Sequence, residues 1–202
     1  MSAKGTVVTL TGMTCSGKST LERRLVTEGY SRIISTTTRK PRPGEVDGKD
    51  YYFVSNTEFL EGYTNGGFVE VAHFAGNHYG ATKAEFERVL ALGNPVVIVV
   101  EPSGRDQIVS WGSSTGVTVI QCNVEASAEK LAQRFIDRML REWHDKGNPN
   151  WEGATSRLTQ MLGTEQEWGN ADYDVRVVMN NIVDEGSAYA LINALVKRAN
   201  SK

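Results

Sequence analysis

The run from Gly12 to Ser19 has the residue types and the spacing of a phosphate-binding loop. It reads Gly-x4-Gly-Lys-Ser. Glycines let backbone N–H groups turn inward around a triphosphate, and a helix that begins at Lys18 or Ser19 points its positive end at the same phosphates. Lys18 offers a compact cation to the β- and γ-phosphates, and Ser19 offers a hydroxyl to Mg²⁺. We therefore predict a P-loop phosphotransferase that binds ATP through Gly12, Met13, Thr14, Cys15, Ser16, Gly17, Lys18, Ser19 and Thr20. The alternative, a structural glycine-rich turn, leaves the expected strand before the loop and helix after it unexplained.

A polar segment further along the chain can hold a second phosphate. Arg39 and Arg42 lie three residues apart beside two prolines. Two guanidinium groups can clamp a phosphate monoester, and prolines reduce the entropy that a loop loses on binding. Tyr51 and Tyr79 can add phenolic O–H donors. A solvated basic turn is the alternative, but beside a P-loop we interpret this segment as the phosphate site of the acceptor.

Glu70 is an acid within an otherwise apolar, strand-like run. It lies on the strand face opposite Val69 and Val71. A carboxylate accepts hydrogen bonds from two adjacent N–H donors, and guanine presents such a pair at N1 and the exocyclic N2, whereas adenine and the pyrimidines do not. We predict that Glu70 reads the base of the acceptor. A solubilising charge on an edge strand is the alternative.

Strand-like and helix-like segments alternate around these residues. We expect helix caps at Asn56 or Thr57 and at Thr82, and a break at 147–150 after the helix expected over 128–143. The expected strands span 6–11, 32–34, 51–54, 68–74, 96–100, 117–122 and 175–179, and the expected helices span 19–28, 56–63, 83–92, 128–143, 154–168 and 185–199.

This alternation predicts an α/β fold, a P-loop kinase core whose parallel sheet is flanked by helices. The stretch 35–82 is turn-rich and β-leaning, so we expect it to form a small inserted lobe. The stretch 129–171 is a helical pair rich in Arg and Trp, which we expect to form a mobile lid.

Composition excludes several other classes of protein. The 202 residues are 40% hydrophobic and 23% charged, with a formal net charge of -2. This is a globular composition without the basic surface that nucleic-acid binding requires. The longest apolar run, 96–100, is too short to span a bilayer, and no secretory signal is visible. With two cysteines and no disulfide framework, we expect a cytoplasmic protein whose partners are small-molecule nucleotides, without membrane or nucleic-acid partners.

The run from Ser35 to Phe53 resembles the guanylate kinase signature, Ser-x-x-Thr-Arg-x-Pro-Arg-x-Gly-Glu-x-x-Gly-x-x-Tyr-x-Phe. Phe68-x-Glu70 and Gly76-Asn77-x-Tyr79-Gly80 continue it. The resemblance covers most of the chain, from the P-loop to the Asn180-Asn181 pair. It implies a nucleoside monophosphate kinase with a core (about 1–34, 83–128 and 172–202), an acceptor lobe (about 35–82) and a lid (about 129–171), in a single domain over 1–202. It also implies transfer of the ATP γ-phosphate to GMP or dGMP with Mg²⁺.

The same resemblance assigns roles to individual residues. The catalytic residues are Lys18 and three lid arginines, Arg134, Arg138 and Arg157, which close over the transferring phosphoryl group. Positioned cations stabilise the charge that builds on its oxygens, although arginines four residues apart also mark a solvated helix face. Asn180 lies near the adenine, and Ser19 holds the metal. The acceptor is bound by Ser35, Arg39, Arg42, Tyr51, Glu70, Tyr79, Ala81 and Glu101.

Three positions depart from the family pattern. Ala81 stands where the family has Ser or Thr, which costs about 1 kcal/mol for one hydrogen bond to the O6 side of guanine, and Thr82 can compensate. Val99 and Glu101 stand where the family has Asp-x-Asp, and Glu101 can order Mg²⁺ through water or contact the base amine. The third departure is a lid segment, 143–152, that is longer than usual and carries two tryptophans, for which we expect hydrophobic packing.

These departures leave the acceptor open between GMP or dGMP and another purine nucleotide, such as one altered at the 6-position. A second class of function is a non-catalytic guanylate-kinase-like binding module, which predicts a degraded P-loop. A sugar phosphate acceptor would leave Glu70 without a purpose. For the oligomeric state we expect a monomer or a homodimer.

Overall fold

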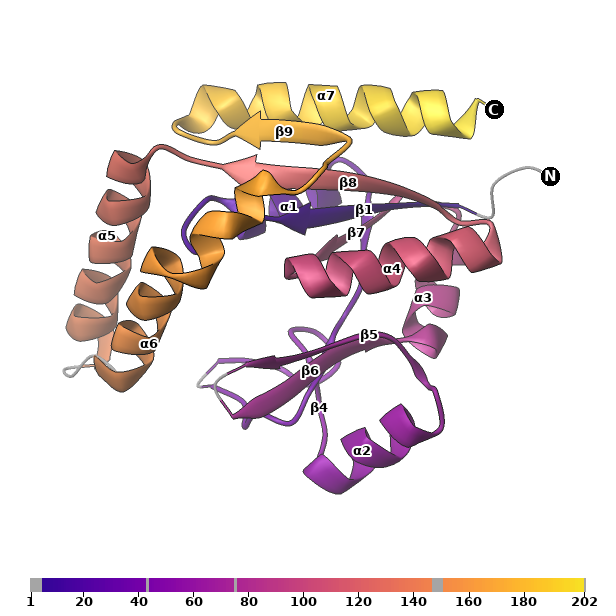
Figure 1. Ribbon diagram of the computed structural model, residues 1–202, viewed down its shortest axis with the longest axis horizontal. Coiled ribbons are helices and arrows are strands. Elements are labelled where there is room, and N and C mark those ends of the chain that lie inside the picture. The colour runs from indigo at the N-terminus through magenta and orange to yellow at the C-terminus, as the bar shows by residue number, and fades with distance from the viewer. Residues whose placement is uncertain (1–4, 43, 75, 147–150, 202) are drawn as a thin grey trace.

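The computed structural model describes residues 5–42, 44–74, 76–146 and 151–201, and its centre is a five-stranded parallel sheet (Figure 1). The strand order is β2-β7-β1-β8-β9, with every pair parallel. The strands are β1 (Thr6–Thr11), β2 (Ser31–Arg32), β7 (Val96–Val99), β8 (Thr118–Glu125) and β9 (Val175–Val178). The predicted α/β class with a parallel sheet is confirmed.

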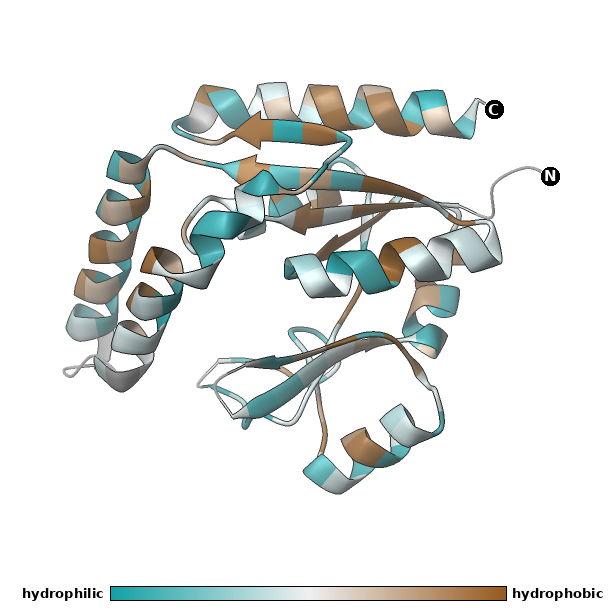
Figure 2. Cartoon of the chain, in the orientation of Figure 1, coloured by the Kyte–Doolittle hydropathy of each residue, from teal (hydrophilic) through white to brown (hydrophobic). Residues whose placement is uncertain are grey.

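Helices cover both faces of this sheet because the central strands are apolar on both sides (Figure 2). On one face, Val8 and Leu10 of β1 pack in a buried cluster with α1 (Lys18–Thr27) and α7 (Ile182–Asn200). On the other face, Val7 packs in a second cluster with α3 (Lys83–Leu90) and α4 (Pro102–Thr115). This alternation fixes the register of β1, whose carboxyl end leads directly into the P-loop.

A small lobe of a second sheet and one helix lies beside the core. The strands, in the order β4-β3-β6-β5, are β3 (Thr36–Thr37), β4 (Tyr52–Phe53), β5 (Phe68–Phe74) and β6 (Asn77–Thr82). Helix α2 (Asn56–Thr64) begins with a capping box between Ser55 and Glu58. Ser55, and not Asn56 or Thr57, is therefore the cap, so that prediction was wrong.

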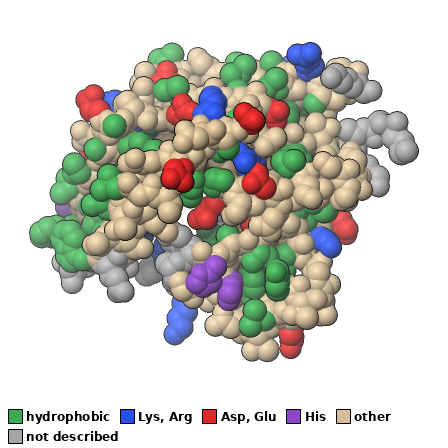
Figure 3. Space-filling view, in the orientation of Figure 1, with side chains coloured by type: hydrophobic (Ala, Val, Ile, Leu, Met, Phe, Trp, Pro, Cys, Tyr) green, Lys and Arg blue, Asp and Glu red, His purple; other side chains and the backbone are tan. Residues whose placement is uncertain are grey.

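Two further helices extend from the core on the side away from α3 (Figure 1). They are α5 (Ala128–Lys146) and α6 (Trp151–Leu162), and a 3-10 helix, η1 (Thr164–Asn170), leads back to β9. Trp143 and Trp151 contact each other edge to face at 6.2 Å between ring centroids, yet both stay more than half exposed. Hydrophobic side chains gather at this end of the molecule (Figure 3), so the tryptophans pair but are not buried in a core.

The structure differs from the sequence-based expectations at several elements. Helix α4 was not predicted, because its glycines and serines have low helix propensity and conceal its apolar face. Strand β6 was not predicted either, and the helix expected over 154–168 is two elements, α6 and η1. The break predicted at 147–150 lies outside the described residues. In the described part of the chain, no helix has both the length and the apolarity to cross a membrane.

Candidate functional site

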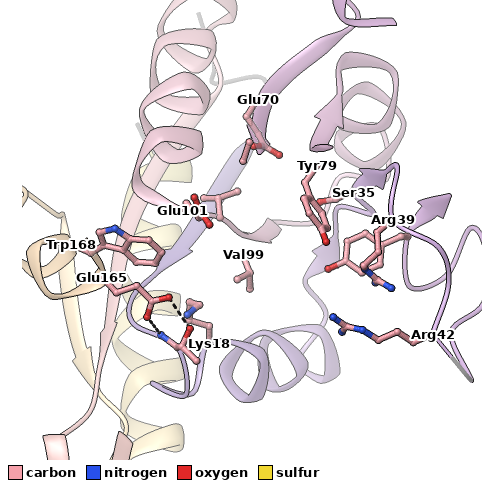
Figure 4. A pocket seen from close by; sticks show the side chains of 14 residues that line it. Lys18, Ser35, Arg39, Arg42, Glu70, Tyr79, Val99, Glu101, Glu165 and Trp168 are labelled. Atoms are coloured by element: carbon pink, nitrogen blue, oxygen red, sulfur yellow. Dashed lines mark hydrogen bonds between the residues drawn. The ribbon is translucent and has the colours of Figure 1, made fainter. Parts of the chain in front are cut away.

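A cavity of about 350 Å³ opens between the core sheet and the small lobe (Figure 4). Its core side carries side chains from the P-loop and the end of β7, and its other side carries the basic loop and the β5–β6 hairpin. Nine residues predicted from the sequence line it: Thr14, Lys18, Ser35, Arg39, Arg42, Tyr51, Glu70, Tyr79 and Glu101. Segments far apart in the sequence thus meet at one site.

The P-loop is held in its curve by close backbone packing. Gly12 has φ 139°, and a Cβ there would lie 2.1 Å from the carbonyl oxygen of Val124, so only glycine fits. Lys18 donates from Nζ to the carbonyl oxygens of Gly12 at 2.6 Å and Met13 at 2.8 Å. Burial lowers the pKa of Lys18 to about 8. The lysine is therefore preorganised within the loop, with its ammonium beside the cavity.

The basic loop holds one arginine by an internal ion pair and leaves the other exposed. Arg39 donates from both terminal nitrogens to Glu45, at 2.9 Å each, and its guanidinium lies 5.3 Å from the centroid of the Tyr51 ring. Glu45 also accepts from the backbone N–H of Arg42 at 2.7 Å. Glu45 therefore orders the loop, and Arg39 and Arg42 both face the cavity (Figure 4).

Glu70 lies on edge strand β5 but is only 5% exposed, so the alternative of a solubilising surface charge is wrong. Burial raises the pKa of Glu70 to about 7, although its carboxylate accepts a hydrogen bond from the backbone N–H of Ala81. A Cβ on Gly104 of α4 would lie 2.9 Å from Glu70 Oε2. The carboxylate is thus confined between the hairpin and α4, and it lines the cavity.

A second cavity, of about 830 Å³, lies on the other side of the P-loop toward α5. Two lid arginines, Arg134 and Arg138, line it together with the loop residues Thr14, Cys15, Gly17, Lys18, Ser19 and Thr20. Arg134 donates to the carbonyl oxygens of Cys15 and Ser16, at 3.2 and 3.0 Å, and also to that of Met179. Arg157 of α6 and Arg138 of α5 both pair with Glu142, at 3.4 Å.

Three other predicted residues, Asn180, Ala81 and Ser16, lie next to these two cavities but line neither of them. Asn180 accepts from the backbone N–H of Ser127 at 2.8 Å, whereas its neighbour Asn181 lines the larger cavity. Ala81 is fully buried and acts through its backbone N–H on Glu70. Ser16 is also buried, and its hydroxyl has no hydrogen-bond partner among the described residues.

The cavity also contains residues that sequence reasoning missed. Glu165 and Trp168, both of η1, line it opposite the small lobe (Figure 4). Glu165 is 4% exposed and bonds to Thr14. The segment 164–170 is polar and has no apolar periodicity, so the sequence offered no signal that one of its acids is buried at the P-loop.

The oxygen donors around the P-loop suit a magnesium ion. Among the residues that the structure describes, no three His, Cys, Asp or Glu side chains are grouped to hold a metal. Mg²⁺ commonly takes few protein ligands and completes its shell with phosphate oxygens and water. Ser19 lines the larger cavity and Glu101 lines the smaller one, on either side of Lys18. This sparse set of donors fits an ion that is carried in with a triphosphate.

The chain is similar over most of its length to proteins of one family. The guanylate kinase family model matches residues 4–196. A guanylate kinase of Deinococcus radiodurans is 44% identical over 201 residues, covering 98% of this chain and 78% of that protein. One of Synechococcus sp. is 35% identical over 182 residues, covering 89% and 92%. The crystal structure of guanylate kinase from Anaplasma phagocytophilum matches the fold with a TM-score of 0.68 at 24% identity, covering 100% of this chain and 89% of that one. The chain therefore belongs to the guanylate kinase family.

Proposed function

We propose that the protein transfers the γ-phosphate of ATP to GMP or dGMP, giving ADP and GDP or dGDP. The observation that carries this proposal is a single cavity lined by Lys18 of the P-loop, by Arg39 and Arg42, and by the buried acid Glu70. The arginines suit the acceptor phosphate, and Glu70 suits the paired N–H donors of guanine. Family membership supports the same chemistry.

In this reaction each group has a definite task. The P-loop N–H groups and Lys18 hold the β- and γ-phosphates, while Arg39, Arg42 and Tyr51 hold the acceptor phosphate so that its oxygen faces the γ-phosphorus. Arg138 and Arg157, brought together at Glu142, supply positive charge from the lid to the transferring oxygens. The lobe boundaries we propose are 35–82 for acceptor binding and 129–171 for the lid.

We also propose that ATP is used with Mg²⁺, held by Ser19 and, through water, by Glu101. The ion would neutralise charge on the β- and γ-phosphates. Since Val99 offers no carboxylate at the end of β7, Glu101 is the acid that this strand provides. The proposed compartment is the cytoplasm, and the proposed partners are small-molecule nucleotides.

A second candidate acceptor is a purine nucleotide altered at the 6-position. The observation that favours it is Ala81, which is fully buried beside Glu70 and has no hydroxyl for the O6 side of guanine. A non-catalytic binding module is less well supported, because Lys18 and Ser19 are both present in an intact P-loop.

Lys18→Ala tests the phosphotransferase proposal directly. We expect turnover, measured as ADP release with GMP, to fall by at least about 1,000-fold, because Lys18 supplies the loop's only side-chain cation to the phosphates. The circular dichroism spectrum should be unchanged. Turnover within tenfold of wild type in a folded Lys18→Ala protein would contradict the proposal.

A further inference from the structure

Residues 14–16 of the P-loop are contacted from two sides by the lid. On one side, the carboxylate of Glu165 accepts from the backbone N–H of Thr14 at 2.5 Å and from its hydroxyl at 2.7 Å. On the other side, Arg134 donates to the carbonyl oxygens of Cys15 and Ser16. A carboxylate therefore accepts from an N–H group of the loop, and a guanidinium group donates to two of its carbonyl oxygens.

Glu165 is an unusual residue to find at a site for anions. It is 4% exposed, and both of its carboxylate oxygens accept hydrogen bonds from Thr14 at the wall of the cavity that Glu165 lines (Figure 4). Burying a carboxylate costs free energy unless the charge is compensated. Here the compensation comes from two charge-assisted hydrogen bonds and from Lys18, whose pKa, lowered by burial, is raised in part by Glu165.

The contacts from Glu165 and Arg134 flank a residue of the loop that has an unfavourable backbone conformation. Cys15 has φ 66° and is the one non-glycine residue in the described chain with a positive φ. The left-handed region costs about 1 kcal/mol for a residue with a Cβ, so the conformation persists only where its surroundings hold it. The bonds from Glu165 and Arg134 hold the residues on both sides of Cys15.

We propose that Glu165 is a positioning residue for donor binding: with Arg134 it clamps Thr14, Cys15 and Ser16 so that the P-loop is shaped for the triphosphate before ATP arrives. This inference rests on the proposed function, because it assumes a nucleoside triphosphate as donor. Glu165 lies on η1, directly after lid helix α6, so the clamp also ties the base of the lid to the loop.

A competing arrangement makes the opposite prediction. If the carboxylate stood in the place of a phosphate group, ATP would have to displace it, and removing the carboxylate would tighten donor binding. The sign of the change in donor affinity therefore separates a clamp from a competitor.

The test measures the dissociation constant of a non-hydrolysable ATP analogue with Mg²⁺, by titration calorimetry and without any acceptor. Glu165→Ala should weaken donor binding by about tenfold or more, since charge-assisted hydrogen bonds are lost. Glu165→Gln, whose amide can still pair with the N–H and the hydroxyl of Thr14, should stay within about threefold of wild type. Glu167→Ala, which changes an exposed acid of the same 3-10 helix, is the matched control and should bind as wild type does.

Thr14→Val keeps the shape of the side chain and removes only its hydroxyl. It should weaken donor binding by about threefold, and the double variant Thr14→Val, Glu165→Ala should be no weaker than Glu165→Ala, because both changes break one contact. If Glu165→Ala does not fold, as judged by thermal unfolding, Thr14→Val and Glu165→Gln decide. Unchanged or tighter donor binding in Glu165→Ala or Thr14→Val would overturn the proposal, as would equal losses in Glu165→Gln and Glu165→Ala.

The two levels of the proposal fail in different ways. If wild type binds no ATP analogue, the proposed function itself is wrong. If wild type binds the analogue but does not use GMP or dGMP, the proposed acceptor or the proposed transfer is wrong, and the comparison of donor affinities among the Glu165 variants still stands.

Discussion

Glu70 is a carboxylate that the fold keeps almost entirely out of water, at 5% exposure, within a cavity that also contains Arg39 and Arg42. A buried acid is costly unless a ligand or a neighbour satisfies it. One backbone N–H, that of Ala81, already bonds to it. The remaining acceptor capacity of the two oxygens is what a guanine edge would use.

Replacing Glu70 by Gln should therefore damage base selection more than phosphate transfer. An amide presents one acceptor and one donor, so its NH₂ group faces an N–H group of guanine. We expect kcat/KM for GMP to fall roughly 10- to 100-fold, and the preference of GMP over IMP, which lacks the N2 amine, to shrink. The KM for ATP should change less than twofold. Guanine selectivity like that of wild type in Glu70→Gln would remove Glu70 from base reading.

Burial of Glu70 also predicts a pH dependence of stability. Its pKa is raised from 4.5 to about 7 in the folded chain. Between these values the folded state keeps a proton that the unfolded state releases, so the free energy of unfolding falls as the pH rises through this window. At pH 8, Glu70→Gln should be more stable than wild type by on the order of 1 to 3 kcal/mol, and near pH 4.5 the difference should vanish. Urea unfolding at both pH values measures this, and a difference that does not change with pH would contradict it.

At the scale of elements, strands β1, β5 and β7 at the site could be predicted, whereas β6, which carries Tyr79, and several supporting elements could not. Strand β1 and the P-loop can be predicted from the sequence because a buried apolar strand and a glycine-rich turn each have a local sequence pattern. Helix α4 has none, since its glycines are set by packing: a Cβ on Gly104 would meet Glu70, and one on Gly112 would lie 2.6 Å from Val119. The pairing of Glu165 with Thr14 spans 151 residues and has no local signature at all.

The close packing of α4 on β5 gives a test of this element. Gly104→Ala would place a methyl group 2.9 Å from Glu70 Oε2 and 3.3 Å from Val100, so we expect a loss of about 1 to 3 kcal/mol in unfolding free energy and a raised KM for GMP. Gly186→Ala is the matched control, because it lies in helix α7 and its added Cβ meets nothing within 4 Å. It should leave the KM for GMP unchanged and should not destabilise the protein. Equal effects of the two variants would contradict close packing of α4 on Glu70.

At the scale of the whole molecule, the P-loop, the small lobe and the lid helices meet around the two cavities. The donor site that we propose is the larger cavity beside α5, and the acceptor site that we propose is the smaller cavity beside the small lobe. Lys18 lines both, so the two substrates would meet at its ammonium. With both substrates bound as proposed, this arrangement would bring the reacting groups together, and residues of the small lobe and the end of β7 would select the base.

The most direct test of the central claim is ADP release by the wild-type chain, measured with ATP and Mg²⁺ across all nucleoside and deoxynucleoside monophosphates. The panel should include the monophosphates of 2-aminopurine and 2,6-diaminopurine. We predict that kcat/KM for GMP or dGMP exceeds that for AMP, CMP and UMP by at least about 1,000-fold, because the unsuitable bases leave Glu70 unpaired. A 2,6-diaminopurine nucleotide that outperforms GMP would favour the 6-altered acceptor instead. A preference for AMP or a pyrimidine nucleotide, or no turnover with any member of the panel, would contradict the account.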